Sequence, residues 1–481
     1  MSRPQPPAAW RRLTAAWLLV LTVVQPAAAG PPPASTSATG PLAERLDAVL
    51  AQAPQQVTVG LVVIDCDNGA VLYEHLPDRP LKPASVLKLL TSAAFLERFG
   101  SDFCYRTTIG YRAGELIVIG AGDPALGDER IAQRHGRPWL GELSAWAGEI
   151  RRRGWEVRRI VLDDSIFEPR LRHEDWPVAE NPTWYQAPVG GINYNDNCLD
   201  ARVRIADGRP VLELFPRLPA RFFVDKLRPG KQHAPLLRRA VGQDVFEFTG
   251  SVARADRFKP VSAARPSVFF GYALQQALRD AGLPAAEVVR RRGIGHLPAD
   301  ARLLAEVQTS LDDVLWRCNT FSQNLFAECL LKSMAAYHPD GRRSGRAGSW
   351  QEGTRLVRST LAGLGLDLTG AVLRDGSGLS HRNRVTARQV ARLLVLMRHH
   401  RCAEQFIESL ARPGRPGSMR RRYNTPALRQ TLRGKTGTIS GVKTLAGYIE
   451  RPDGRVLAFA ILGNGGPSTG LITRLADEIA R

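Results

Sequence analysis

Residues 85–95 read Ser-Val-Leu-Lys-Leu-Leu-Thr-Ser-Ala-Ala-Phe, and this stretch predicts a buried helix that opens on a serine. Ser85 and Lys88 are three residues apart, so their side chains share one helical face and the amine can approach the hydroxyl. A serine hydroxyl is a poor nucleophile unless a base lies beside it. Lys88 can be that base once burial or a neighbouring positive charge removes its proton. Residues 440–443 also match Ser-x-x-Lys and are interpreted as loop or strand without function.

A second motif, Ser322-Gln323-Asn324, comes just before a predicted helix. The Ser322 hydroxyl is expected to point at Lys88 and complete a proton relay, and the Asn324 amide is expected to face a substrate carbonyl. Gln323 is expected to face away from the reaction. Taken alone, such a sequence is more often a solvated cap at the start of a helix.

A third motif, Lys435-Thr436-Gly437-Thr438, lies on a predicted strand. Lys435 brings positive charge, the two threonines offer hydroxyls to a carboxylate, and Gly437 lets backbone segments approach closely. The backbone amides of Thr438 and Ser85 are expected to form an oxyanion hole. An isolated Lys-Thr-Gly sequence is also compatible with an ordinary edge strand.

These three motifs are informative together, because each lies on the type of element that its chemistry requires. The chain has eight lysines and 58 arginines, yet two of the lysines lie in the motifs. Arginine cannot give up its proton, so it cannot replace Lys88. A Ser-His-Asp triad is disfavoured, because no histidine has a recognisable catalytic setting and Asp123 and Asp375 lie in sequences typical of turns.

Strand patterns at both ends of the chain predict a single sheet. We therefore expect an α+β fold class in which an antiparallel five-stranded sheet is covered by helices. The catalytic domain is assigned to residues 41–99 plus 301–481, and residues 100–300 are assigned to one or two inserted β-rich accessory domains. The predicted strands cover residues 57–64, 71–73, 433–438, 445–449 and 456–462, with helices over 42–50 and 471–479.

Residues 1–29 are predicted to be a secretory signal peptide. Three arginines precede an apolar run at 13–24, and small residues follow at 27–29. The run is much shorter than the ~20 residues of a membrane-spanning helix, so cleavage is favoured over an uncleaved anchor. Residues 30–40, rich in Pro, Ser and Thr, are expected to be a flexible tether. The protein is therefore expected in the periplasm or cell envelope.

The formal net charge of +20 favours an anionic partner. Export and the scattered placement of the basic residues argue against nucleic acid. An anionic envelope polymer fits better, an arginine-rich solvated surface is the alternative, and peripheral association with the membrane or envelope stays open. Six cysteines permit disulfides in an oxidising compartment without selecting a pairing. The sequence has no metal-binding motif, and no metal or cofactor is expected.

Together with segments 120–124, 185–189, 193–197 and 375–380, the three motifs resemble the penicillin-binding and serine β-lactamase superfamily. The similarity is specifically to class C low-molecular-mass penicillin-binding proteins, the D-alanyl-D-alanine carboxypeptidase/endopeptidases. It extends from about residue 42 to the C-terminus. The resemblance implies a penicillin-binding/serine β-lactamase-like transpeptidase domain, with inserted domains in the 237 residues between Ser85 and Ser322.

The resemblance also implies a role for each motif. Ser85 would be the acylated nucleophile, Lys88 the proton acceptor, Ser322 the relay hydroxyl and Lys435 the carboxylate-binding charge. Gln323 departs from the Asp or Asn usual at its position. The implied activity is hydrolysis of peptidoglycan stem peptides and cross-links through an acyl-enzyme, with β-lactams as inhibitors. The alternatives are a β-lactamase-type hydrolase that deacylates fast and a non-catalytic wall-binding protein that retains the cleft.

Overall fold

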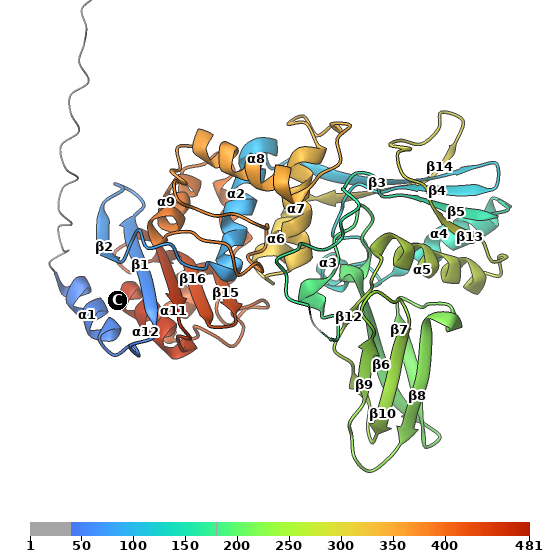
Figure 1. Ribbon diagram of the computed structural model, residues 1–481, viewed down its shortest axis with the longest axis horizontal. Helices are drawn as coiled ribbons and strands as arrows, with labels where there is room; N and C mark the ends of the chain where they lie inside the picture. Colours follow the sequence, from blue (N-terminus) through green and yellow to red (C-terminus); the bar gives the residue numbers. More distant parts are fainter. Residues whose placement is uncertain (1–39, 179) are drawn as a thin grey trace, which may run out of the picture. The chain divides into compact units, whose positions relative to one another are not determined.

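Strands from the two ends of the chain form one antiparallel sheet in the computed structural model, which describes residues 40–178 and 180–481 (Figure 1). The strand order is β15-β16-β17-β1-β2, so the N-terminal pair joins the C-terminal three through β1 and β17. The prediction of a five-stranded antiparallel sheet is confirmed. Its strands are β1 (Thr58–Asp65), β2 (Val71–His75), β15 (Leu432–Ile439), β16 (Val442–Glu450) and β17 (Val456–Asn464).

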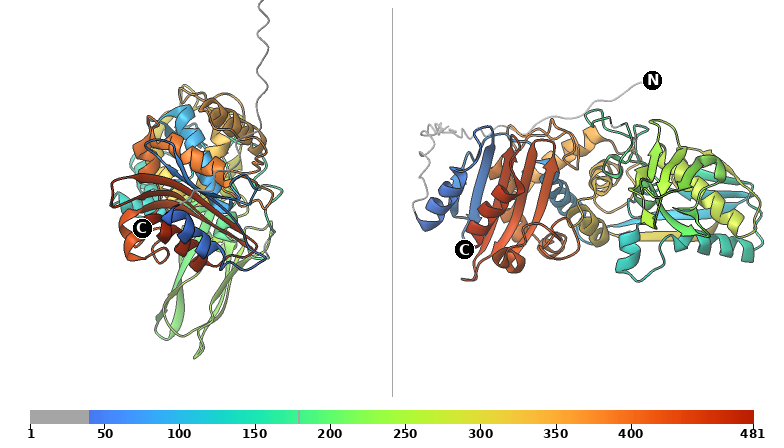
Figure 2. Two further views of the ribbon diagram at one scale, coloured as in Figure 1. Left: turned by 90° about the vertical axis from the view of Figure 1, so that its left-hand side faces the viewer. Right: turned by 90° about the horizontal axis from the view of Figure 1, so that it is seen from below.

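Helices cover both faces of this sheet (Figure 2), because β1 is apolar on both sides. Leu61 and Val63 pack in the core against one helical layer, and Val62 and Ile64 pack in the core against the other. The first layer contains α1 (Pro41–Leu50) and α12 (Thr469–Ala480), close to their predicted ranges, together with α11 (Pro426–Thr431).

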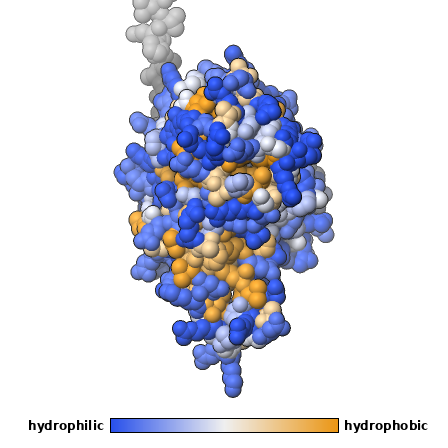
Figure 3. Space-filling view, turned by 90° about the vertical axis from the view of Figure 1, so that its right-hand side faces the viewer, coloured by the Kyte–Doolittle hydropathy of each residue, from blue (hydrophilic) through white to orange (hydrophobic). Residues whose placement is uncertain are grey.

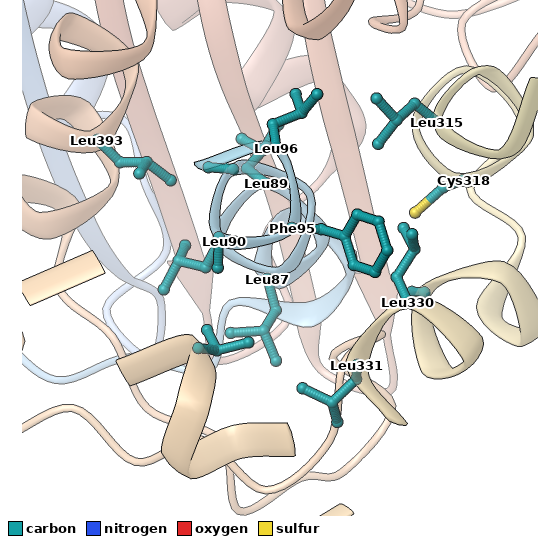
Figure 4. Packing of buried hydrophobic residues seen from close by; sticks show 14 of the residues in the cluster. Leu87, Leu89, Leu90, Phe95, Leu96, Leu315, Cys318, Leu330, Leu331 and Leu393 are labelled. Carbon is teal, nitrogen blue, oxygen red and sulfur yellow. The ribbon is translucent and has the colours of Figure 1, made fainter. Parts of the chain in front are cut away.

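Helix α2 (Leu87–Phe99) lies at the centre of the second layer, and Figure 4 shows its leucines and Phe95 surrounded by apolar side chains of other helices. Every residue from Leu87 to Leu96 is buried. Burying one leucine contributes about 1.5–3 kcal/mol, so the helix that carries Lys88 is held firmly. Its neighbours are α6 (Leu311–Asn319), α7 (Asn324–Ala336), α8 (Trp350–Gly363), α9 (Ala387–Arg398) and α10 (Ala403–Glu408).

The region between the two parts of the main sheet forms a second five-stranded sheet of order β13-β5-β4-β3-β14. Helices α4 (Gly141–Arg152) and α5 (Pro266–Asp280) belong to the same apolar core as this sheet. The strands are β3 (Cys104–Arg112), β4 (Glu115–Ile119), β5 (Arg159–Asp163), β13 (Glu287–Arg290) and β14 (Arg302–Ser310), and a short helix, α3 (Glu129–Arg134), follows β4.

A lobe of hairpins extends from this region (Figure 1). Figure 3 shows apolar residues gathered on its side of the molecule, where α4, β7 and β8 line a groove of about 520 Å³. The lobe contains β6 (Cys198–Ala206), β7 (Arg209–Phe215), β8 (Phe223–Pro229), β9 (Leu236–Arg239), β10 (Phe246–Val252), β11 (Asp256–Arg257) and β12 (Val261–Ser262).

The inserted region differs in two respects from the β-rich domains expected over residues 100–300. It contains two long helices besides its strands, and β14 pairs with β3 although it begins after residue 300. The division into catalytic and accessory domains therefore stays a prediction, with its second boundary better placed after β14. The predicted signal peptide and nearly all of the predicted tether lie outside the described residues.

All six cysteines lie in the described part of the chain and carry free thiols. Five of them are buried, and Cys104 is half-buried. Within residues 40–178 and 180–481, no helix combines the length and apolar character that crossing a bilayer would require.

Candidate active site

Ser85 lies in a single 3-10 turn, η1 (Ala84–Val86), which leads directly into α2. Two glycines hold this turn from either side. A Cβ on Gly378, whose φ is +84°, would overlap the carbonyl oxygen of Ala84. A Cβ on Gly437 would lie 2.9 Å from the carbonyl oxygen of Pro83. The third motif therefore needs glycine at this position because its strand passes directly over the serine turn.

Lys88 is completely buried one turn beyond the serine. Its Nζ lies 2.9 Å from Ser85 Oγ, 2.6 Å from Asn324 Oδ1 and 2.9 Å from the carbonyl oxygen of Ser377. Burial lowers the pKa of Lys88 to about 8, against the opposing effect of nearby acidic groups. An amine with that pKa is partly neutral near physiological pH, so it can accept the proton of the Ser85 hydroxyl.

Ser322 and Lys435 pair with each other. Lys435 Nζ donates to Ser322 Oγ at 2.7 Å and to the carbonyl oxygen of Thr436 at 2.7 Å. The expected contact from Ser322 to Lys88 is replaced by this one, because a left-handed backbone at Ser322, with φ of 61°, turns its hydroxyl toward β15. Burial lowers the pKa of Lys435, and the charge of Lys88 lowers it further.

The Asn324 amide contacts protein groups rather than an open cleft. Its Oδ1 accepts from Lys88, and its Nδ2 donates to the carbonyl oxygen of Tyr185 at 2.8 Å. Asn324 is the first residue of α7 and is buried, so its side chain lies on the Lys88 side of the motif. This differs from the sequence-based expectation that the amide faces a substrate carbonyl.

The outer edge of β15 lies against the serine turn. The backbone N–H and C=O of Gly434 bond Ala411 on this outer side of the sheet. Because strand groups alternate in direction, the N–H groups of Thr436 and Thr438 point the same way. Thr436 is buried and Thr438 is exposed. The edge thus offers backbone donors beside Ser85, next to the charge of Lys435.

A buried carboxylate that the sequence analysis did not single out supports the Lys88 site. Glu328 accepts from the backbone N–H of Gly376 at 3.0 Å and of Ser377 at 2.8 Å, and from Trp350 Nε1 at 2.8 Å. It thereby fixes the loop whose Ser377 carbonyl contacts Lys88. Burial and the charge of Asp375 raise the pKa of Glu328 to about 7. The available signal was its position one helical turn after Asn324.

Asp375 serves the same loop as a turn residue, as its sequence context predicted. Its carboxylate accepts from the backbone N–H of Gly378 at 2.9 Å and of Ser380 at 2.7 Å. All nine histidines lie in the described part of the chain, and none of them hydrogen-bonds to Ser85 there. A Ser-His-Asp arrangement is therefore not present around Ser85.

Gln323 faces away from Ser85, toward the inserted region. Its Nε2 donates to Asp196 Oδ2 at 2.8 Å, and the same oxygen accepts from Arg317 Nη2 at 2.8 Å. Arg317 also contacts Asp128 and is only 4% exposed. Burial raises the pKa of Asp196 to about 7. This cluster joins the second motif to segment 193–197, for which the sequence suggested no role.

The pKa of Lys88 leads to a prediction about pH. At saturating penicillin, we expect the acylation rate constant to rise as the pH passes through about 8, because only the neutral amine can accept a proton. Stopped-flow measurements would give the profile. Lys443→Ala removes the lysine of the other Ser-x-x-Lys sequence and should leave the profile unchanged. A rate constant that is independent of pH across this region would contradict the role of Lys88.

The sheet, the serine turn and the grouped lysines define a class: a penicillin-binding, serine-type hydrolase. The chain belongs to the D-Ala-D-Ala carboxypeptidase 3 (S13) family, whose pattern matches residues 42–477. It is therefore a serine-type D-Ala-D-Ala carboxypeptidase. The predicted relationship to class C low-molecular-mass penicillin-binding proteins and the predicted fold class are both confirmed.

Individual relatives agree with this assignment. The D-alanyl-D-alanine carboxypeptidase of Actinomadura sp. (strain R39) is 32% identical over 492 residues, covering 94% of this chain and 87% of that protein. The D-alanyl-D-alanine carboxypeptidase DacB of Haemophilus influenzae is 24% identical over 446 residues, covering 86% of each. The crystal structure of penicillin binding protein 4 (dacB) from Haemophilus influenzae has the same fold, with a TM-score of 0.71 at 21% identity, covering 91% of this chain and 99% of that one.

Proposed function

We propose that Ser85 is the nucleophile of this carboxypeptidase and that it cleaves peptidoglycan stem peptides and D-amino-acid cross-links through an acyl-enzyme. The observation that carries the proposal is the 2.9 Å separation of Lys88 Nζ from Ser85 Oγ at a fully buried position. Burial gives the lysine a lowered pKa, which is what a base for serine requires.

Each step of the proposed reaction has a residue assigned to it. Ser85 Oγ bonds to the carbonyl carbon of the penultimate D-alanine while Lys88 takes the hydroxyl proton. The amides of Ser85 and Thr438 hold the oxyanion, each donor contributing about 3 kcal/mol. The C–N bond then breaks, the proton returns to the leaving amine, and water hydrolyses the ester. Lys435 binds the carboxylate of the leaving residue.

The pair of Ser322 and Lys435 supports a modified route for the proton. Because Ser322 Oγ accepts from Lys435 Nζ, its own proton is free to pass to the leaving nitrogen, and Ser322 then takes up the proton that Lys88 removed from Ser85, so Lys435 keeps its charge. Asn324 then positions Lys88 through its Oδ1, which lies 2.6 Å from Nζ. Thr436 and Thr438 supply hydroxyls to the substrate carboxylate, and Gly437 keeps the strand close to Ser85.

The protein is proposed to work outside the cytoplasm, in the periplasm or cell envelope, after removal of residues 1–29. Peptidoglycan peptides are its substrates, and β-lactams inhibit it because they acylate the same serine. A β-lactam complex has been described for penicillin binding protein 4 of Haemophilus influenzae, a protein of the same fold. The formal net charge of +20 falls to +17 once the three arginines of residues 1–29 are removed, and this positive charge suits an anionic wall polymer.

Labelled penicillin tests the proposal. We expect the protein to retain a stable label, Ser85→Ala to retain none, and Ser440→Ala, at the other Ser-x-x-Lys sequence, to label like the parent. Equal labelling of Ser85→Ala and the parent would exclude the mechanism. Rapid loss of label with penicillin hydrolysis would favour the β-lactamase alternative. A labelled protein that releases no D-alanine and cuts no cross-link would favour the wall-binding alternative.

A further inference from the structure

A loop rich in arginine borders the active site. We call residues 412–424, Arg-Pro-Gly-Arg-Pro-Gly-Ser-Met-Arg-Arg-Arg-Tyr-Asn, the arginine loop. Arg412 pairs with Glu408. The other four arginines are exposed, and none of them forms an ion pair with any residue that the structure describes: Arg415, Arg420, Arg421 and Arg422.

The backbone of the arginine loop is fixed to two of the catalytic motifs. At its start, Ala411 exchanges two backbone hydrogen bonds with Gly434, of 3.0 and 2.9 Å, one residue before Lys435. In its middle, the Ser418 N–H donates to the carbonyl oxygen of Thr320 at 2.8 Å, two residues before Ser322. The loop therefore spans the side of the site on which Lys435 and Ser322 meet.

Buried anchors hold the arginines in place. Met419 and Tyr423 are buried in the core beneath the main sheet, and the three consecutive arginines lie between them. Gly417 packs so closely on Thr320 that a Cβ there would lie 2.7 Å from its Cγ2. The charge of Arg422 also contributes, after burial and Lys88, to lowering the pKa of Lys435. The positive charges thus stand on a fixed backbone beside the site.

We propose that the arginine loop binds carboxylates on the leaving half of a cross-linked wall peptide and so favours cross-link cleavage over release of free D-alanine. This inference rests on the proposed function. Free D-alanine carries one carboxylate, which Lys435 binds. The leaving half of a cross-link continues beyond Lys435 as a second stem peptide with further carboxylates. Arginine suits that ligand because its guanidinium pairs with a carboxylate through two parallel hydrogen bonds.

The experiment compares one monomeric pentapeptide with one cross-linked dimer. The variant Arg415→Gln/Arg420→Gln/Arg421→Gln keeps Arg422, because that charge acts on Lys435. We expect kcat/KM for the dimer to fall about tenfold, mainly through KM, with less than a twofold change for the monomer. Added salt should weaken dimer cleavage by the parent more than by the variant.

The matched control removes three exposed arginines of the hairpin lobe that also form no ion pair with a described residue: Arg209→Gln/Arg228→Gln/Arg254→Gln. This control variant should have the same kcat/KM as the parent for both the monomer and the dimer. Amidating the leaving-half carboxylates of the dimer should lower kcat/KM of the parent protein. The expected factor is the same as the one by which the loop variant is slower on the unmodified dimer.

Three outcomes would overturn the inference: an unchanged dimer reaction in the loop variant, equal losses for monomer and dimer, or an equal loss in the control. A parent protein that turns over the monomer but never the dimer would also overturn it and would leave the carboxypeptidase mechanism standing. Failure of the parent to be acylated by penicillin or to release D-alanine would instead overturn the proposed function itself.

Discussion

Lys88→Arg is expected to lower both penicillin acylation and D-alanine release by about 10³-fold, within the range attributed to general-base catalysis. The arginine side chain keeps a positive charge in the same place but cannot become neutral, so it cannot accept the Ser85 proton. Quenched-flow labelling with penicillin would give the acylation rate constant, and thermal unfolding would show whether the variant is folded.

Lys435→Arg is the matched control, because Lys435 is the other buried lysine of the site. Its proposed task is to hold a carboxylate, which needs charge and not deprotonation. We expect that variant to lose about tenfold in kcat/KM, mainly through KM, as a bulkier group enters a closed position. Acylation of Lys88→Arg at a rate near that of the parent would show that another group takes the proton.

Arg317→Met is expected to destabilise the fold by about 3–5 kcal/mol, because it leaves two carboxylates of the inserted region without their buried partner. Arg317 is 4% exposed and contacts both Asp128 and Asp196. Urea unfolding, followed by tryptophan fluorescence, would measure the loss. At a temperature where the variant remains folded, we also expect slower penicillin acylation, since Gln323 and its motif lose a fixed neighbour.

Arg152→Met provides the comparison for Arg317→Met. Arg152 pairs with Glu149 on an exposed helical surface, and its side chain is 72% exposed. Exposed ion pairs contribute little, so the urea midpoint should not change measurably. Asp196→Asn removes one of the two carboxylates and keeps a polar side chain beside Gln323, so combining it with Arg317→Met should recover part of the stability. If the double variant is no more stable than Arg317→Met, the unpaired carboxylate of Asp196 is not the cause of the destabilisation.

The main sheet could be predicted because its strands carry their own signals. The run from Val57 to Ile64 is apolar on both faces, as a strand covered by helices requires, and the C-terminal strands are separated by recognisable turns. The three motifs lie on elements next to or within this sheet. The three motifs could therefore be assigned to one site from local sequence patterns and from the resemblance to penicillin-binding proteins.

The partners inside the site could not be predicted in the same way. Ser322 contacts Lys435 across 113 positions of sequence. The backbone of Ser322 is left-handed, but the residue is not a glycine, so the sequence gives no sign of this conformation. Asp196 reaches Gln323 from the inserted region, across 127 positions. Such contacts depend on how separate layers of the structure pack together. The hydrophobic periodicity of the sequence carries no information about that packing. In contrast, α5 was missed although it carried a local signal, since Pro266 opens it at the first helical position.

The joining of β1 to β17 has a consequence for biosynthesis. The segment with Ser85 emerges early from the ribosome, but the strands that flank it, including the one with Lys435, are the last to be made. Pairing segments so distant in the chain is slow. A nascent polypeptide that ends before residue 432 lacks three of the five strands and one of the two site lysines, so competence for catalysis arises only when translation is nearly complete.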